Sequence, residues 1–299
     1  MTGVATPSEW LGGLRGRTLP AAVAPVLVGL GASWAPGLTP LWNRAGLALA
    51  VALALQVGAN LANDYYDGVR GSDAGRSGPQ RLVASGAAKP GAVRAAALAC
   101  FGLAAAAGVG LTWVTRAWWL LAVGAAAVAA AWFYTGGRHP YGYKALGEAG
   151  VFVFFGPVAV LGTCYTQHLS ISWRAAVASV GVGLLACAIL MANNLRDLSS
   201  DKKAGKVTLA VKLGESKARA LYAWEMWLAL LLAAACAIGR PRVLVVLLMA
   251  VPTARLTSAV GAGLGGLDLV RVLTRTGQVE LGYSILMGLA LANLGLFEG

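Results

Sequence analysis

Four polar residues in the first quarter of the chain have the spacing of a cation-binding helix face. Asn60, Asn63, Asp64 and Asp67 stand at positions i, i+3, i+4 and i+7, which places their side chains on one side of a helix. Carboxylates that share one face repel each other unless a positive charge neutralises them. Because carboxylate and amide oxygens are ligands that Mg²⁺ prefers, the spacing predicts a magnesium site.

A second segment, 130 residues further along, repeats this pattern. Residues 62–67 and 192–197 both read Ala-Asn-(Asp/Asn)-x-x-Asp, and Asn194, Asp197 and Asp201 again share one helix face. The repeat predicts two related helical halves that face each other. The alternative is that these acids only cap helix ends and form salt bridges in loops. The predicted metal ligands are Asn63, Asp64, Asp67, Asn193, Asn194, Asp197 and Asp201, and the four aspartates among them are also the predicted catalytic residues.

Basic residues follow both acidic segments closely. They occur in residues 68–81, in residues 201–208 and in a third polar loop, residues 134–148. Acids that hold Mg²⁺ and bases that take the remaining negative charge suit a magnesium-bound diphosphate. The predicted diphosphate ligands are Arg70, Arg81, Lys144 and Lys206.

The third loop is also rich in tyrosine. Aromatic rings can stabilise a developing carbocation, and they are also common anchors at the membrane interface. Both interpretations stay open for Tyr141 and Tyr143. Further residues that could contribute to the site are Asn60, Asp73, Tyr134, Tyr141 and Arg138.

The rest of the chain is apolar enough to place these motifs in a membrane. Of 299 residues, 58% are hydrophobic and 12% charged, and the mean hydropathy is +0.68. Soluble domains carry about 25% charged residues, so a soluble enzyme, a disordered tail and a fibrous protein are disfavoured. We expect a single all-α domain over residues 1–299 that crosses the membrane several times. The nine predicted transmembrane helices are 18–34, 45–63, 95–114, 117–134, 149–166, 175–194, 220–239, 242–257 and 280–297.

The basic residues predict how the chain is oriented in the membrane. The N-terminus and the loops that carry both acidic segments fall on a side with 19 of the 24 Lys and Arg residues, and the other side has 5. Cytoplasmic loops carry an excess of Lys and Arg, so we expect a cell-membrane protein with its N-terminus and site on the cytoplasmic side. This distribution argues against a nucleic-acid partner, although the net charge is +12. The four cysteines are isolated in apolar segments and are expected to be buried small residues.

Residues 60–86 and 193–214 resemble the UbiA superfamily of intramembrane aromatic prenyltransferases. They are most similar to the branch that prenylates 1,4-dihydroxy-2-naphthoate in menaquinone biosynthesis. The segments that favour this branch are Asn63-Asp64-Tyr65-Tyr66-Asp67, Gly78-Pro79-x-Arg81, Ala84-Ser85-Gly86 and Leu146-Gly147-Glu148. The sequence departs from the superfamily at Gly71, where another aspartate is usual, and in the spacing from Tyr134 to Lys144, which exceeds the usual Tyr-x-x-x-Lys.

This resemblance implies a helical bundle around a central cavity that opens to lipid, with a cytoplasmic cap above it. It implies that two aspartate-rich motifs hold Mg²⁺ and a polyprenyl diphosphate. The implied reaction moves the polyprenyl group onto 1,4-dihydroxy-2-naphthoate, a bicyclic aromatic acid, and releases CO₂ and diphosphate to give demethylmenaquinone.

Three alternatives stay open at this point. The first is a prenyltransferase of the same type with another aromatic acceptor, such as 4-hydroxybenzoate or homogentisate. The second is a cation-coupled membrane transporter, because membrane acids and internal repeats also occur in transporters. The third is a non-catalytic membrane scaffold. The motifs set neither the prenyl chain length nor the oligomeric state.

Overall fold

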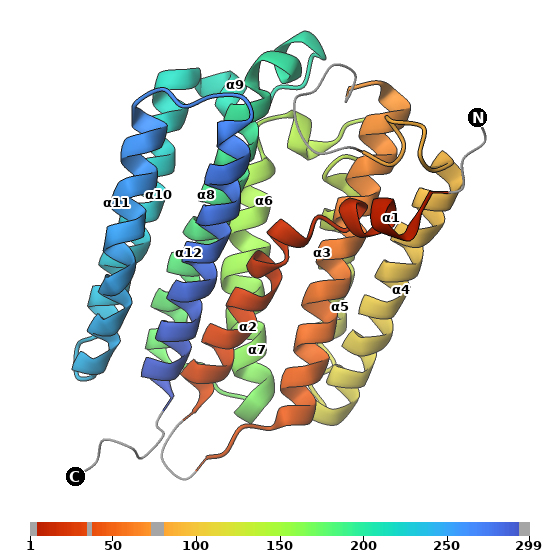
Figure 1. The fold of residues 1–299 in the computed structure, drawn as a ribbon. Helices are drawn as coiled ribbons and strands as arrows, with labels where there is room; N and C mark the ends of the chain where they lie inside the picture. The colour runs from red at the N-terminus through yellow and green to blue at the C-terminus, as the bar shows by residue number, and fades with distance from the viewer. Residues whose placement is uncertain (1–4, 35–37, 73–80, 293–299) are drawn as a thin grey trace.

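The computed structural model describes residues 5–34, 38–72 and 81–292, and all regular elements in these ranges are helical (Figure 1). The prediction of an all-α protein is therefore confirmed. The long helices are α2 (Pro20–Ser33), α3 (Trp42–Arg70), α4 (Pro90–Thr115), α5 (Leu120–Phe133), α8 (Trp173–Lys203), α10 (Glu215–Cys236), α11 (Ala250–Gly261) and α12 (Asp268–Leu291). The shorter helices are α1 (Pro7–Gly13), α6 (Gly147–Val153), α7 (Ala159–His168) and α9 (Leu209–Leu213). The 3₁₀ segments are Gly16–Thr18, Tyr141–Tyr143 and Pro241–Met249, and a π-helical turn, Phe154–Val158, joins α6 to α7.

Six helical stretches in the described part of the chain are long and apolar enough to cross a membrane. They are Trp42–Arg70, Pro90–Thr115, Gly147–His168, Trp173–Lys203, Glu215–Cys236 and Pro241–Gly261. Helices α2 and α5 are apolar but shorter. The structure therefore supports a chain that spans a membrane several times, and the count of nine spans stays a prediction.

The predicted boundaries differ most at the last helix. Helix α12 begins at Asp268, twelve residues before the predicted start at 280. The prediction began the helix at Glu280 because charged residues interrupt an apolar run, but the Glu280 side chain is fully buried inside the bundle. The end of that predicted helix, 293–297, lies outside the described residues.

The two helices that carry the acidic motifs are longer than predicted. Helix α3 continues to Arg70 instead of 63, and α8 continues to Lys203 instead of 194. Both motifs therefore lie on the last turns of continuous helices. Helix α3 ends at Gly71, whose φ of 74° is the left-handed conformation that glycine adopts readily at a helix C-terminus.

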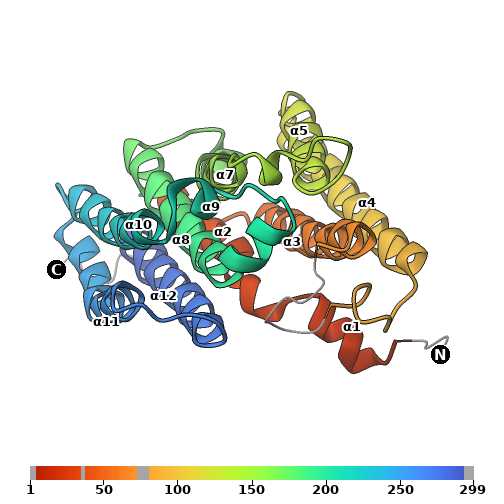
Figure 2. The ribbon, with the colours of Figure 1, turned by 90° about the horizontal axis from the view of Figure 1, so that it is seen from above.

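Helix α8 is the central element of the bundle. Of the apolar 18-residue stretch by which α8 could cross the membrane, 78% is buried inside the bundle, against 22–39% for the corresponding stretches of the other five candidate spans. It packs against α2, α6, α10 and α12, and the largest hydrophobic cluster surrounds it. A second, smaller cluster lies between α3 and α4. The motif-bearing ends of α3 and α8 lie at the same end of the molecule (Figure 1), and α2 lies between the two helices and packs against both (Figure 2).

Candidate active site

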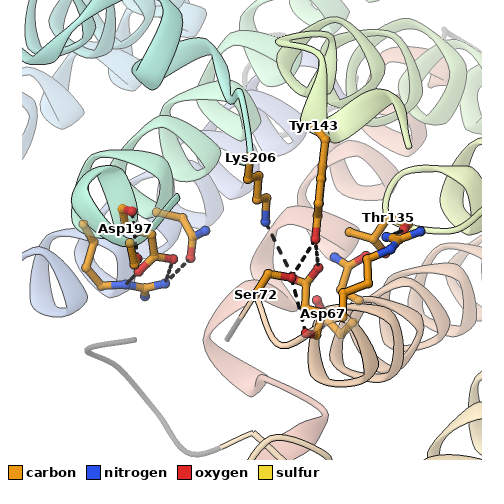
Figure 3. Close-up of polar contacts among 12 residues, drawn as sticks. Asp67, Ser72, Thr135, Tyr143, Asp197 and Lys206 are labelled. Atoms are coloured by element: carbon orange, nitrogen blue, oxygen red, sulfur yellow. Dashed lines mark hydrogen bonds and ion pairs between the residues drawn. The ribbon is translucent and has the colours of Figure 1, made fainter. Parts of the chain in front are cut away.

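Asp67 lies buried near the end of α3, where side chains from three other positions surround it. The Tyr143 hydroxyl donates a hydrogen bond of 2.6 Å to Asp67 Oδ1, and Lys206 Nζ lies 3.6 Å from Oδ2 (Figure 3). Ser72 Oγ lies 2.9 Å from the same tyrosine hydroxyl. The first acidic motif thus meets both of the polar loops that the sequence placed on its side of the membrane.

A short backbone pairing brings these two loops together. The Ala145 amide donates to the Val207 carbonyl at 2.7 Å, and the Val207 amide donates to the Tyr143 carbonyl at 3.2 Å. Lys206 Nζ also lies 4.9 Å from the centre of the Tyr143 ring, within range of a cation–π interaction. Burial and the charge of Asp67 raise the pKa of Tyr143, so its hydroxyl stays protonated and remains a donor.

The second motif has its own cation. Arg196 donates from Nε to Asp197 Oδ1 at 2.8 Å and from Nη2 to Oδ2 at 2.6 Å, a two-point contact with the carboxylate (Figure 3). The same Nη2 donates to Asn193 Oδ1 at 2.8 Å. Asp201, one helical turn further along α8, is also buried. Both acidic helix ends therefore hold carboxylates that face a cation of the same chain.

Asp64 bonds to the backbone of the loop that follows α3. Its Oδ2 accepts from the Leu82 amide at 3.0 Å and its Oδ1 from the Val83 amide at 2.9 Å. Gly68 allows this close approach, because a Cβ at that position would lie 2.5 Å from Val83 Cγ1. Asp64 thereby fixes the segment that carries Arg81.

Two predicted asparagines bond to other parts of the protein. Asn60 Nδ2 donates to the Leu14 carbonyl at 3.1 Å and to Thr18 Oγ1 at 3.0 Å, so it fastens the N-terminal segment to α3. Asn194 Nδ2 donates to Glu148 Oε1 at 2.8 Å, which ties α8 to α6. In this structure both amides therefore hold neighbouring elements in place.

Asn63 and Arg70 both contact the turn after α5. Thr135 Oγ1 donates to Asn63 Oδ1 at 2.7 Å. The Arg70 guanidinium donates to the carbonyls of Thr135 and Gly137 and lies 5.3 Å from the centre of the Tyr66 ring. These contacts give Arg70 a clear role in holding the loop 134–148 against α3.

The remaining predicted residues belong mainly to the loop 134–148. The rings of Tyr134 and Tyr141 pack edge to face, 5.4 Å apart. The side chains of Arg138 and Lys144 are exposed. Asp73 lies outside the described residues.

A small pocket lies beside both motifs and is rich in arginine. Arg81 and Arg196 line it together with Asn193, and the N-terminal segment adds Arg15 and Arg17. The carboxylate of Asp64 also lines the pocket, but the four arginines outnumber it, and this excess of positive charge suits an anion. The backbone of Arg15 has a φ of 53°, a conformation that non-glycine residues rarely adopt and that is more frequent at functional sites.

Several of these residues are not among the predicted site residues. Arg15, Arg17 and Arg196 belong to the 19 basic residues of the predicted cytoplasmic side, although the i and i+3 spacing of Asn193 and Arg196 places these two on one helix face. The sequence points to Tyr143 only as an aromatic ring, and no spacing signal points to its hydroxyl. Its contact with Asp67 depends on tertiary structure alone.

The oxygen-rich character of the site suits a hard cation, but the carboxylates do not form a closed cage. Asp67, Asp197 and Asp201 with Asn63 and Asn193 offer only oxygen donors near the two motifs, as Mg²⁺ prefers. Within the described ranges, no three Asp, Glu, His or Cys side chains stand close enough to hold a metal ion by themselves. Any metal ion here would need ligands from another source as well.

The fold and the site together define a membrane-type helical protein in which two acid-bearing helix ends adjoin an arginine-lined pocket. Such an arrangement suits an anionic substrate that is handled together with a cation. The chain belongs to the UbiA prenyltransferase family, whose model matches residues 22–280.

Two relatives that share one name, 1,4-dihydroxy-2-naphthoate octaprenyltransferase, align over most of the chain. A 1,4-dihydroxy-2-naphthoate octaprenyltransferase of Mycobacterium tuberculosis is 47% identical over 290 residues, which cover 97% of this chain and 98% of that protein. A protein of the same name from Escherichia coli is 40% identical and covers 74% of this chain and 73% of its own length.

Solved structures of UbiA homologues share the fold. A homologue from Aeropyrum pernix has a TM-score of 0.67 at 17% identity and covers 91% of this chain and 96% of its own. A homologue from Archaeoglobus fulgidus, bound to DMAPP and Mg²⁺, has a TM-score of 0.65 at 16% identity and covers 93% of this chain and 98% of its own.

Proposed function

We propose that this protein transfers a polyprenyl group from a polyprenyl diphosphate to 1,4-dihydroxy-2-naphthoate, releasing CO₂ and diphosphate and giving a prenylated naphthalenediol, the reduced form of demethylmenaquinone. The observation that carries the proposal is the 47% identity to the M. tuberculosis octaprenyltransferase, which extends over nearly the whole of both chains. The geometry supports it, because Asp67 and Asp197 lie at the same end of the bundle, each beside a cation, Lys206 and Arg196 respectively.

Mg²⁺ is the cofactor that we propose for this site. Asp67 of α3 and Asn193, Asp197 and Asp201 of α8 are the residues that would hold it, since they offer hard oxygen donors. The A. fulgidus homologue bound to DMAPP and Mg²⁺ supports this choice. When bound, the ion would neutralise charge on the diphosphate and make it a better leaving group. Because no three acids converge within the described ranges, diphosphate oxygens are the natural source of the remaining ligands.

The residues of the chain then have distinct tasks. Lys206 and the pocket residues Arg17 and Arg81 neutralise the negative charge of the diphosphate. Tyr143 keeps Asp67 oriented through its hydrogen bond. The apolar helices exclude water while the bond between the prenyl carbon and the diphosphate oxygen breaks.

The acceptor ring completes the reaction without a covalent enzyme intermediate. A ring carbon of the dihydroxynaphthoate bonds to the allylic carbon, and the electron pair of the leaving carboxylate returns to the ring as CO₂ departs. No proton has to be removed from the ring if the prenyl group takes the position of the carboxylate.

We further propose that nine helices span the cell membrane and that the loops around Tyr143 and Lys206, together with α9, form a cytoplasmic cap over the site. Six apolar helices of sufficient length support this topology. The excess of Lys and Arg on the side of the motifs supports a cytoplasmic site. The polyprenyl tail would lie along the lipid-facing side of the bundle.

A competition among acceptors tests the proposal. Purified protein with Mg²⁺ and a polyprenyl diphosphate is offered 1,4-dihydroxy-2-naphthoate, 4-hydroxybenzoate and homogentisate, and the products are identified by mass. We expect a prenylated naphthalenediol that has lost the mass of CO₂. Transfer to 4-hydroxybenzoate or homogentisate in preference would assign a different acceptor, and absence of transfer to any acceptor would contradict the proposal.

A further inference from the structure

We infer that Arg196 is an exchangeable counter-ion: it pairs with Asp197, and it turns to the diphosphate when a divalent metal ion takes its place at the carboxylate. This inference rests on the proposed function, because it requires the site to receive a diphosphate together with a divalent ion. Its consequence is that the metal ion and the diphosphate strengthen each other's binding.

The first observation is the completeness of the contact between Arg196 and the second motif. The Asp197 carboxylate accepts from Arg196 with both oxygens, at 2.8 Å and 2.6 Å, and the Asn193 amide oxygen accepts from the same guanidinium at 2.8 Å. The side chains of Arg196 and Asp197 are only 3% and 5% exposed. A buried carboxylate is costly without a partner, so Arg196 stabilises the charged form of Asp197.

The second observation is where Arg196 lies. It borders the arginine-lined pocket, together with Asn193, Arg81 and Arg17. Arg196 therefore adjoins both the carboxylate that it pairs with and a pocket that suits an anion. We expect the exchange of partners to take place by a change of the Arg196 rotamer.

The first motif also has a cation beside its carboxylate, because Lys206 Nζ lies 3.6 Å from Asp67 Oδ2. Among the described residues, a carboxylate of each motif therefore has a cation beside it. A divalent ion that enters alone meets two positive charges at short range, and a diphosphate that enters alone meets the aspartates. When both enter together, Arg196 and Lys206 turn to the phosphate oxygens and leave the aspartates to the ion.

Binding of Mn²⁺, a spectroscopic substitute for Mg²⁺, tests the inference without turnover. The affinity of the purified protein for Mn²⁺ is measured by electron paramagnetic resonance, with and without inorganic pyrophosphate. For the wild type we expect pyrophosphate to tighten Mn²⁺ binding about tenfold or more. For Arg196→Gln we expect Mn²⁺ alone to bind about tenfold more tightly than to the wild type, because a positive charge beside the ion has been removed. The additional gain from pyrophosphate should shrink accordingly.

Two further variants keep the test decisive. Lys203→Gln removes the same charge from an exposed position on the same helix, and its Mn²⁺ affinity should stay within about twofold of the wild type. Arg196→Lys keeps the charge but not the two-point contact, and it should lie between the wild type and Arg196→Gln. If Arg196→Gln does not fold, as judged by thermal unfolding, Arg196→Lys carries the comparison.

The outcomes separate the inference from the proposed function. Unchanged or weaker binding of Mn²⁺ alone in a folded Arg196 variant, while the wild type still shows tightening by pyrophosphate, overturns the counter-ion role and leaves the proposed function standing. If the wild type binds Mn²⁺ neither alone nor with pyrophosphate, the proposed function and the inference both fail.

Discussion

The Tyr143 hydroxyl lies 2.6 Å from Oδ1 of Asp67, across a separation of 76 residues in the chain. It joins the loop between α5 and α6 to the last turns of α3. On the other oxygen of the same carboxylate lies Lys206, at 3.6 Å. Asp67 is thus oriented by a neutral donor on one side and a cation on the other, which fixes the direction of the carboxylate.

We expect Tyr143→Phe to lower kcat about tenfold, because Asp67 loses the donor that orients it. The variant also loses a hydrogen bond to a charged group, which contributes about 1.5–3 kcal/mol, so its thermal stability should fall although the phenyl ring keeps the packing. Steady-state transfer assays with the purified variant check this result. Activity equal to that of the wild type would show that the hydroxyl does not orient Asp67.

The same hydroxyl gives a prediction about pH. Burial and the charge of Asp67 raise the pKa of Tyr143 above its ordinary value. Its contribution to stability is therefore fully present below about pH 10, the pKa of an unfolded tyrosine, and is lost only as the pH rises through the raised value in the folded protein. The difference in thermal stability between wild type and Tyr143→Phe should stay constant from about pH 6 to about pH 10. A difference that disappears near neutral pH would contradict this assignment.

Asp64 and Asp67 are three residues apart, but their different partners predict different effects of substitution: changing Asp64 should mainly affect stability and substrate binding. In Asp64→Asn one of the two backbone amides, of Leu82 or Val83, loses its acceptor, and we expect a loss of about 1–3 kcal/mol of stability. The loop carrying Arg81 is loosened, so KM for the prenyl diphosphate should rise more than kcat falls. A loss confined to kcat, with unchanged stability, would instead make Asp64 a direct ligand.

The close approach of the loop to α3 can be tested at Gly68. A Cβ there would lie 2.5 Å from Val83 Cγ1 and 3.3 Å from the Ala84 nitrogen, so Gly68→Ala should destabilise the protein by about 1–3 kcal/mol. The matched control is Gly46→Ala on the same helix, where nothing lies within 4 Å of the new Cβ. The control should leave the melting temperature unchanged or raise it, because alanine favours a helix. Equal melting temperatures for both variants would show that the loop does not pack as described.

The sequence was sufficient to predict the helical architecture and the two acidic helix ends. Apolar runs and helix-face spacing are local signals, and both motifs do lie on helix faces, on α3 and α8. The predicted start of α12 is wrong because a charged residue normally ends an apolar run, whereas the charged residue Glu280 is buried inside the bundle. That burial depends on neighbouring helices, which a pattern read along one segment does not contain.

Within the site, the sequence did not predict the hydrogen-bond partner of each side chain. Asp64 and Asp67 look equivalent in the motif, yet one bonds to backbone amides and the other to Tyr143. The difference arises because Val83 packs closely against Gly68 of α3, whereas the loop before α6 pairs with Val207. Such contacts depend on loops that meet only in the folded protein.

Removal of divalent cations should abolish transfer reversibly. The candidate ligands are oxygen donors, so we expect Mg²⁺ or Mn²⁺ to restore activity after chelation and soft metal ions to restore it poorly. Prenyl transfer is measured after treatment with a chelator and again after each ion is added back. Full activity in the presence of excess chelator would show that transfer does not require a divalent cation.

The most direct test follows the carboxyl carbon of the acceptor. Release of labelled CO₂ from carboxyl-labelled 1,4-dihydroxy-2-naphthoate is measured with a polyprenyl diphosphate and Mg²⁺ for the wild type, Asp67→Asn and Asp197→Asn. We predict release that depends on the prenyl diphosphate in the wild type, and a loss of about a hundredfold or more in both variants, with the helical content preserved. Near-normal release by either variant, or release without the prenyl diphosphate, would contradict the assignment of these two aspartates to prenyl transfer.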